Sequence, residues 1–136
     1  LMGHALIASF GGIPLLYMGD EIGLLNDHSY RSDPALADDG RWMHRPRMDW
    51  DRVARLGDDS PASRIHAGVR AILAVRRATP ELAATTPTVI LDLGHPRLFI
   101  FERPGDLCTV ICLFNFTESD QGITPWALRL DPALRY

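Results

Sequence analysis

The sequence has few cysteines, and their spacing excludes a disulfide between them. Its 136 residues include only Cys108 and Cys112, four positions apart in a strand-like stretch. A strand rises about 3.3 Å per residue, so the two residues stand roughly 13 Å apart, which is too far for a disulfide. We interpret both as small core residues, and a cytoplasmic setting fits this pattern better than a secreted, disulfide-stabilised scaffold.

The sequence also lacks a block of like charge and a long apolar run. Its 17 acidic and 14 basic residues are interspersed and give a net charge of −3. Nothing in this pattern predicts binding to nucleic acid or to a membrane surface. The longest apolar stretches, residues 5–10 and 13–18, are separated by Gly11 and Gly12. Both fall well short of the roughly 20 residues that a membrane-spanning helix needs.

The N-terminal part predicts a helix followed by a buried strand. Residues 1–10 are largely apolar and compatible with a helix, which the glycines at 11 and 12 end. Residues 13–18 are almost wholly apolar, which is typical of a parallel strand buried on both faces. A helix, a glycine turn and a strand in this order form one step of a doubly wound sheet or of a β/α barrel.

A long polar loop and a second helix are predicted next. Residues 19–59 are rich in Asp, Arg, Gly and Pro and keep no period of 2 or 3.6. A loop of this length directly after a strand is often functional. Ser60 and Pro61 then provide an N-cap and a proline at the first helical position, and the apolar spacing predicts a helix that ends before Thr79 and Pro80.

The C-terminal part changes to the period of strands. Turn-forming residues separate four predicted strands, at 88–93, 97–102, 107–114 and 126–130. We therefore expect an antiparallel β-module. Four strands make up only part of a complete β-sandwich. The predicted organisation is an α/β region over residues 1–79 followed by an incomplete β-domain over residues 80–136.

Two segments resemble a known family of carbohydrate-active enzymes. Residues 12–23 read GIPLLYMGDEIG. This stretch resembles the eighth barrel strand of glycoside hydrolase family 13, the α-amylase family, which reads approximately G-x-P-x-x-Y-x-G-D-E. Residues 38–47 read DDGRWMHRPR. They resemble the loop after that strand in amylosucrases and the related sucrose hydrolases.

The resemblance covers residues 1–77 well and becomes much less specific beyond them. The sequence Asn-Phe-Thr at 115–117 is similar to a motif of the family's C-terminal β-domain. The resemblance implies the end of a (β/α)8 TIM barrel, with its last strand, a long loop and its last helix. Part of an antiparallel β-sandwich domain would follow this barrel end.

The resemblance implies an enzyme that transfers glucosyl units from sucrose, with retention, to an α-glucan or to water. Retaining cleavage needs two carboxyl groups about 5 to 5.5 Å apart. Asp20 and Glu21 are consecutive, so on a strand their side chains point to opposite faces. They are therefore poorly placed to act together on one glycosidic bond. In this family the three catalytic carboxylates follow strands four, five and seven, which places them upstream of Leu1. We therefore expect no catalytic residue in this chain, no activity of the chain alone, and the N-terminal barrel segment as its partner.

Four loop residues are candidates for sugar contact or for closing the pocket. A guanidinium group can hold hydroxyls or pair with a carboxylate in fixed geometry. By resemblance, Arg45 is the first choice for pairing with an upstream Asp at the end of the glucose pocket, and Arg41 is the second. Trp42 either stacks on a sugar or, as we favour, pins the loop to the barrel. His44 either reaches a substrate hydroxyl or serves as a local hydrogen-bond partner.

Three residues at the exit of the predicted strand have supporting roles by the same resemblance. Glu21 is expected to anchor loops at the barrel mouth, Asp20 to be a solvated acid, and Gly19 to give the backbone freedom for a tight turn. Asp27, Asp33, Asp38 and Asp39 lack the ordered spacing of a calcium loop. We expect neither a metal nor a cofactor.

Two other functions stay open. The sequence Gly19-Asp20-Glu21-Ile22-Gly23 also fits a trehalose synthase or α-glucosidase-like member of the family. The Arg-Trp-x-His-Arg-Pro sequence at 41–46 does not fit that alternative and is the discriminating feature. A non-catalytic structural or carbohydrate-binding β-module is the second alternative, supported by the missing carboxylates and the unfinished β-domain.

Overall fold

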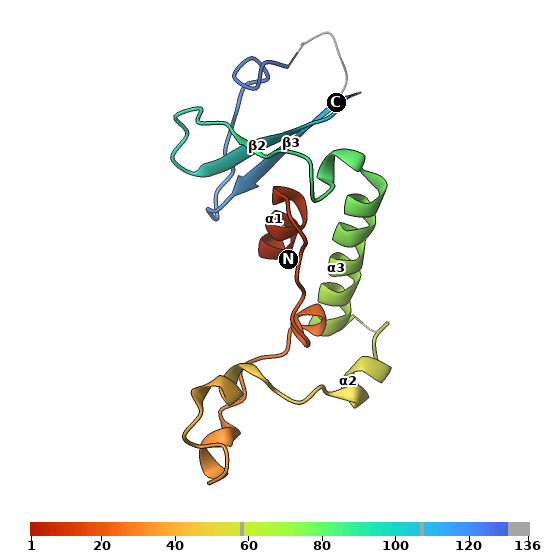
Figure 1. Cartoon of the computed structure of the whole chain (residues 1–136), viewed down its shortest axis with the longest axis vertical. Coiled ribbons are helices and arrows are strands. Elements are labelled where there is room, and N and C mark those ends of the chain that lie inside the picture. The colour runs from red at the N-terminus through yellow and green to blue at the C-terminus, as the bar shows by residue number, and fades with distance from the viewer. Residues whose placement is uncertain (58, 107, 131–136) are drawn as a thin grey trace.

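Two helices lie side by side under a small antiparallel sheet, and a long loop extends from the other end of the helices (Figure 1). The computed structural model describes residues 1–57, 59–106 and 108–130. The described elements are the helices α1 (Met2–Phe10), α2 (Trp50–Ala54) and α3 (Pro61–Ala78), the strands β1 (Val89–Ile90), β2 (Leu98–Pro104) and β3 (Thr109–Asn115), and the 3₁₀ helices η1 (Asp20–Ile22), η2 (Ser29–Ser32), η3 (Gly40–His44) and η4 (Pro80–Leu82). The chain is therefore a mixed α and β structure.

Helix α3 confirms the helix predicted from the capping residues. The Ser60 side chain accepts a hydrogen bond of 3.2 Å from the backbone N–H of Ser63, and Pro61 takes the first helical position. This satisfies one of the donors that a helix N-terminus leaves unpaired. The helix ends at Ala78 because Thr79 precedes Pro80 and adopts an extended conformation. Helix α1 likewise confirms the helix predicted over residues 1–10.

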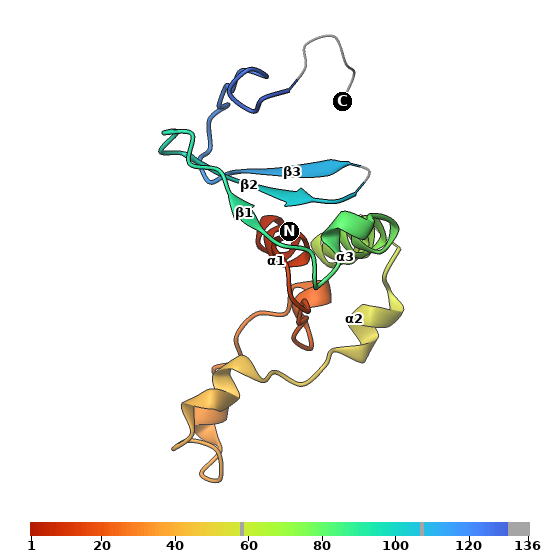
Figure 2. The ribbon, with the colours of Figure 1, turned by 45° about the horizontal axis from the view of Figure 1, so that its top comes forward.

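The strands form one antiparallel sheet in the order β1-β2-β3. Figure 2 shows this sheet lying across α1 and α3. Phe101 on β2 is fully buried, and its ring lies 5.3 Å from the ring of Phe10 on α1 and 5.8 Å from that of Phe114 on β3. Aromatic contacts of this kind add roughly 0.5–1.5 kcal/mol each beyond the area they bury. The apolar core therefore spans the boundary between α1 and the sheet.

Arg103 on β2 holds the C-terminal end of α1. Its side chain is completely buried, with 0% of its surface exposed. One guanidinium nitrogen, Nη1, donates to the carbonyl of Ser9 at 2.5 Å, and the other, Nη2, donates to the carbonyls of Ala83 and Thr86 at 2.6 and 3.0 Å. Burial, together with the nearby charge of Arg76, lowers the pKa of Arg103. The charge is balanced here by carbonyl dipoles at a helix C-terminus, where a cation is favoured.

Two further side chains complete the same junction. From α3, Arg76 donates through Nη1 to the carbonyl of Ala8 and through Nη2 to that of Gly12 at 2.7 Å. From the segment before β1, the Thr88 hydroxyl donates to the carbonyl of Phe10. Side chains from α3, from β2 and from the segment before β1 thus pair the last carbonyls of α1, and these contacts fix the relative positions of the helices and the sheet.

Residues 13–18 do not form the strand that their apolar pattern predicts. They run as an unpaired segment between α1 and η1 (Figure 1), and Ile13 and Leu15 are 89% and 78% exposed. A strand exists only where a neighbour supplies ladder hydrogen bonds. No such neighbour lies beside this segment among the described residues. The prediction of a strand is therefore wrong for this structure, and the missing partner is the physical reason.

The strand predicted at residues 126–130 is also wrong. This stretch is a series of turns, in which the N–H groups of Arg129 and Leu130 donate to the carbonyls of Trp126 and Pro125 at 3.0 Å. Pro125 favours the start of such a turn because its ring fixes φ.

The remaining strand predictions are confirmed with shifted ends. Residues 88–93 contain the short β1, and residues 97–102 correspond to β2. The start predicted at Leu107 lies outside the described residues, and the observed β3 begins at Thr109. Both cysteines are free, but Cys108 is exposed and Cys112 is only partly buried, so their interpretation as core residues is wrong for Cys108. The predicted loop 19–59 contains η1, η2, η3 and α2, so it is more regular than its composition indicates.

Two negative findings apply to the described part of the chain. None of its helices is both long and apolar enough to cross a membrane. Within the same residues, no group of three or more His, Cys, Asp or Glu side chains is placed to hold a metal ion.

Replacement of Arg103 by Met tests the helix junction. The variant keeps an unbranched side chain but leaves the carbonyls of Ser9, Ala83 and Thr86 without their donor. We expect the free energy of unfolding to fall by about 3–5 kcal/mol, because buried polar groups lose their partners. Urea denaturation followed by circular dichroism measures this change. The surface variant Arg97→Met is the control, and an equal effect of both variants would contradict the role of the junction.

Candidate functional site

The turn after residue 18 is fixed by a contact between a side chain and the backbone. The Glu21 carboxylate oxygen Oε2 accepts a hydrogen bond of 2.8 Å from the N–H of Gly19, and the N–H of Leu24 donates to the Gly19 carbonyl at 2.9 Å. Gly19 has φ +99°, a conformation that favours glycine. Glu21 thus fixes a turn within its own segment, and its expected role at a barrel mouth stays a prediction. The positive φ of Gly19 uses the backbone freedom of glycine.

The same turn is held against both helices. Ile22 of η1 is completely buried, and η1 packs against α3. A Cβ atom at Gly23 would lie 2.6 Å from Cδ1 of Ile65 on α3, so the turn and the helix are in close contact. Asp20 is half-exposed, and its Oδ2 lies 3.7 Å from Nε2 of His4 on α1. Asp20 is therefore close to a specific partner as well as partly solvated.

A groove of about 720 Å³ opens in the loop beyond this turn. It is lined by Leu25, Asn26, Asp27, Ser29, Tyr30, Asp33, Leu36, Trp42, Arg45, Pro46 and Arg47. The N–H of Asp27 donates to the carbonyl of Met43 at 2.9 Å and ties the two sides of the loop together. The lining combines two aromatic rings, two guanidinium groups and two carboxylates, which is a mixed polar and apolar surface.

Arg41 points out of this groove and is already paired. Its guanidinium group makes a bidentate contact with Asp39, with Nε–Oδ1 and Nη2–Oδ2 distances of 2.8 Å. Asp39 also accepts a hydrogen bond of 3.0 Å from the N–H of Arg41. These hydrogen bonds lower the pKa of Asp39 to about 2. The pair stabilises the start of η3, and Arg41 does not line the groove.

Arg45 lies in the groove and keeps its donors free. Within residues 1–57, 59–106 and 108–130, its guanidinium group makes no hydrogen bond or ion pair. Trp42 lines the groove beside it and remains partly exposed. The Nδ1 atom of His44 lies 3.2 Å from the side-chain oxygen of Asn26, which makes His44 a local partner that holds η3. The structure thus brings Arg45 and Trp42 together and leaves Arg41 and His44 outside.

The groove also includes residues outside the four loop candidates. Tyr30, Asp27 and Asp33 lie along the lining with Arg47. Asp27 accepts from the N–H of Ser29 at 2.8 Å and Asp33 from that of Ala35 at 2.9 Å, so both carboxylates stabilise turns. The recurring pairing of an Asp with the N–H two residues later is a recognisable turn signal in the sequence.

No protein-family model matches the chain. The relationship to glycoside hydrolase family 13 therefore stays a prediction that rests on residues 12–23 and 38–47.

Replacement of Gly19 by Ala tests the turn that leads into the groove. The added Cβ would lie 2.8 Å from Cδ1 of Leu24 and would have to adopt φ +99°. We expect a loss of about 1–3 kcal/mol in the free energy of unfolding, measured by urea denaturation. The control is Gly122→Ala, a position with no heavy atom within 4 Å and no positive φ. Equal stability of the two variants would contradict the proposed constraint at residue 19.

Removal of the Arg41 side chain tests the pair with Asp39. The folded-state pKa of Asp39 is about 2, below the ordinary value of 3.8. The contact therefore contributes fully above pH 3.8 and is lost as the pH falls towards 2. In Arg41→Gln we expect the pKa of Asp39 to rise from about 2 towards 3.8 without reaching it, because the backbone N–H of residue 41 still donates to the carboxylate. Titration followed by ¹³C NMR measures this change. An unchanged titration in this variant would show that another group lowers the pKa.

Proposed function

We propose that this chain is part of an enzyme that transfers α-glucosyl units from sucrose, with retention, to an α-glucan or to water, and that the loop groove contributes to its sugar pocket. The observation that supports the proposal is the composition of the groove, which is lined by Trp42, Tyr30 and Arg45. Among the described residues, the Arg45 guanidinium group has no hydrogen-bond or ion-pair partner. The resemblance of residues 12–23 and 38–47 to family 13 gives the substrate class. In this proposal those residues are the last strand and the following loop of a TIM barrel, and the sheet begins a C-terminal β-sandwich domain.

A sugar matches this groove in its chemistry. A pyranose ring has apolar C–H faces, which aromatic rings cover, and a rim of hydroxyl groups, which charged side chains bind strongly. Binding sites commonly combine an apolar lining with a few converging polar groups in this way. Arg45 lines the groove and has no hydrogen-bond partner for its guanidinium group among the described residues, whereas Arg41 lies outside the lining and is held by Asp39 through Nε and Nη2.

The groove is suited to binding and not to acid–base chemistry. Asp27 accepts hydrogen bonds from Ser29, and these bonds lower the pKa of its carboxyl group. A general acid in glycoside cleavage needs a raised pKa. Asp33 accepts from the N–H of Ala35 and likewise stabilises a turn. The catalytic nucleophile and acid therefore come, in this proposal, from the remainder of the barrel.

A second candidate function is carbohydrate binding without catalysis. The hydrogen bonds of Asp27 and Asp33 to the backbone favour it, because both carboxylates that line the groove stabilise turns of the loop. Turnover distinguishes the two functions, since a binding module would retain sugar affinity and release no product.

Sucrose turnover tests the proposed function. Released fructose and free glucose are measured separately for this chain and for the form extended through its upstream reading frame. We expect turnover only in the extended form, with more fructose than free glucose, because part of the glucose is transferred to acceptor. Replacement of Arg45 by Ala should lower kcat/KM of that form by about 10²–10³-fold, as loss of one oriented charged donor does elsewhere. The surface variant Arg97→Ala is the matched control.

Three results would contradict this proposal. Turnover by the 136-residue chain alone would place catalytic carboxylates within it. Sugar binding without turnover in the extended form would favour the binding module. Equal kcat/KM for the Arg45 and Arg97 variants would remove Arg45 from the pocket.

A further inference from the structure

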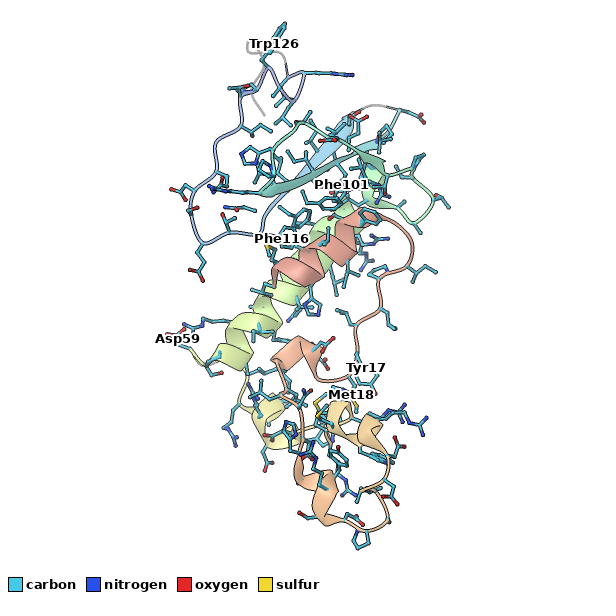
Figure 3. All side chains as sticks on the ribbon, turned by 90° about the vertical axis from the view of Figure 1, so that its left-hand side faces the viewer. Tyr17, Met18, Asp59, Phe101, Phe116 and Trp126 are labelled. Carbon is cyan, nitrogen blue, oxygen red and sulfur yellow. The ribbon has the colours of Figure 1, made fainter. Side chains whose placement is uncertain are left out.

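Glu81 is a buried carboxylate at the boundary between the helices and the sheet. It lies in η4, directly after α3, and only 9% of its surface is exposed. η4 packs against α1, α3, β2 and β3. Figure 3 labels Phe101, which lies at the same boundary between the sheet and the helices. An isolated buried charge costs much free energy, so the partner of Glu81 matters for the stability of η4.

That partner is the thiol of Cys108, the residue directly before β3. The thiol donates a hydrogen bond to the Glu81 carboxylate. A Cβ atom at Gly105 would lie 2.8 Å from Oε1 of Glu81 and 3.0 Å from the backbone oxygen of Cys108, so the two residues meet at Gly105. The N–H of Gly105 donates to that backbone oxygen at 2.9 Å. Among the described residues, the Glu81 side chain has no other hydrogen-bond or ion-pair partner.

Cys108 is the exposed member of this pair. The hydrogen bond to Glu81, together with desolvation and the charge of that carboxylate, raises the pKa of the Cys108 thiol. The thiol therefore keeps its proton, and its role as a donor, at neutral pH. Disulfides are attacked by the thiolate and not by the thiol. Reaction of Cys108 with a disulfide thus requires loss of the proton that holds Glu81.

We propose that Cys108 is a site of mixed-disulfide formation, and that modification there releases Glu81 and loosens η4. The Cys108 thiolate attacks one sulfur of glutathione disulfide. A new S–S bond forms to Cys108, the S–S bond of the reagent breaks, and a glutathione thiolate leaves, while the proton of Cys108 passes to solvent. Cys108 is oxidised and the leaving glutathione is reduced. This inference does not rest on the proposed function.

Release of Glu81 acts on the junction at the end of α1. Ala83 directly follows η4, and its carbonyl accepts from Nη2 of Arg103 at 2.6 Å. The Thr86 carbonyl accepts from the same nitrogen at 3.0 Å. A groove of about 410 Å³ lies beside Glu81 and gives the released carboxylate a path to water. Movement of η4 towards this groove would displace carbonyls that hold Arg103.

Cys112 is less suited to the same reaction. Its side chain is only partly exposed, and burial raises the pKa of its thiol. It is close to Ser9 and Arg103, within the core and away from any carboxylate that depends on it. Modification of an exposed thiol with a buried partner, as at Cys108, is what links a surface reaction to the packing beneath it.

The reaction rate tests the part played by Glu81. The substitution Cys112→Ala leaves Cys108 as the single thiol, and its reaction with glutathione disulfide at mildly alkaline pH is followed by mass spectrometry. We expect Glu81→Gln to react faster, because a neutral amide no longer holds the thiol proton. For each unit by which the pKa of Cys108 falls, the thiolate fraction rises tenfold and its nucleophilicity falls, a net gain of about threefold.

The control for this measurement is Glu118→Gln, which changes an exposed acidic residue beyond the far end of β3. It should leave the rate unchanged. Equal rates for the Glu81 and Glu118 variants would show that Glu81 does not hold the Cys108 proton, and would overturn the inference.

Hydrogen exchange tests the release of η4. The amides of Leu82 and Ala83 donate to the carbonyls of Thr79 and Pro80 at 3.0 Å, so their exchange reports opening of η4. We expect exchange about tenfold faster in the modified chain, and return to the original rate after reduction with dithiothreitol, because a buried carboxylate has lost its donor. Amides in the middle of α3, at residues 68–74, should exchange alike in both states.

Two substitutions separate loss of the donor from the bulk of the adduct. Cys108→Ser keeps a hydroxyl donor for Glu81 and cannot form a disulfide, so its exchange at Leu82 and Ala83 should match the unmodified chain with or without the reagent. Cys108→Ala has no donor, and its exchange should match the modified chain. Exchange of Cys108→Ala at the unmodified rate would overturn the inference, because the contact with Glu81 would then not hold η4.

Two further outcomes would overturn the inference. Modification of Cys108 with unchanged exchange at Leu82 and Ala83 would make it an exposed thiol without structural effect. A disulfide between two copies in place of the mixed disulfide, seen as a dimer on a non-reducing gel, would identify a different reaction. None of these measurements involves sucrose turnover, so the inference and the proposed function fail independently.

Discussion

The arrangement of the chain depends on how the C-terminal end of α1 is satisfied. A helix leaves its last carbonyls without partners, and here those carbonyls meet Arg103 from β2, Arg76 from α3 and Thr88 from the segment before β1. Each bond joins α1 to a part of the chain at least 68 residues away in sequence. The junction therefore orients the sheet over the helices, and the bond from Arg76 to the Gly12 carbonyl fixes where residues 13–18 leave the core.

Local features of the sequence predicted the elements whose stabilising contacts are local. The helix at 61–78 was predictable because Ser60 and Pro61 define its start and Thr79 its end. Residues 13–18 were mispredicted as a strand because an apolar pattern shows only that the side chains favour burial. It does not show whether a neighbouring strand is present to pair with them. The turns at 125–130 were mispredicted because the apolar residues there carry no sign of whether a neighbouring strand exists.

The groove was only partly predictable for a related reason. The arginines at 41 and 45 indicated a binding loop, yet the sequence did not show which of the two guanidinium groups lines the groove. That distinction depends on Asp39, whose carboxylate pairs with Nε and Nη2 of Arg41, whereas Arg45 lines the groove with Trp42. Tyr30 also lines the groove, where the hydrogen bond from the N–H of Asp27 to the carbonyl of Met43 joins the two sides of the loop. Contacts between residues 16 or more positions apart, such as the bond from Asp27 to Met43, are not encoded in a local pattern.

The burial of Arg103 has a consequence for the response of the chain to ionic strength. Dissolved ions screen charges that water reaches, over a distance of about 8 Å at 0.15 M salt, and screen buried contacts far less. The bonds of Arg103 to carbonyls lie inside the core, whereas the contacts of Asp39 with Arg41 and of Asp59 with Arg64 lie at the surface. Concentrated salt therefore weakens the surface ion pair of the groove loop first. The helices and the sheet keep their relative positions at salt concentrations that loosen this loop.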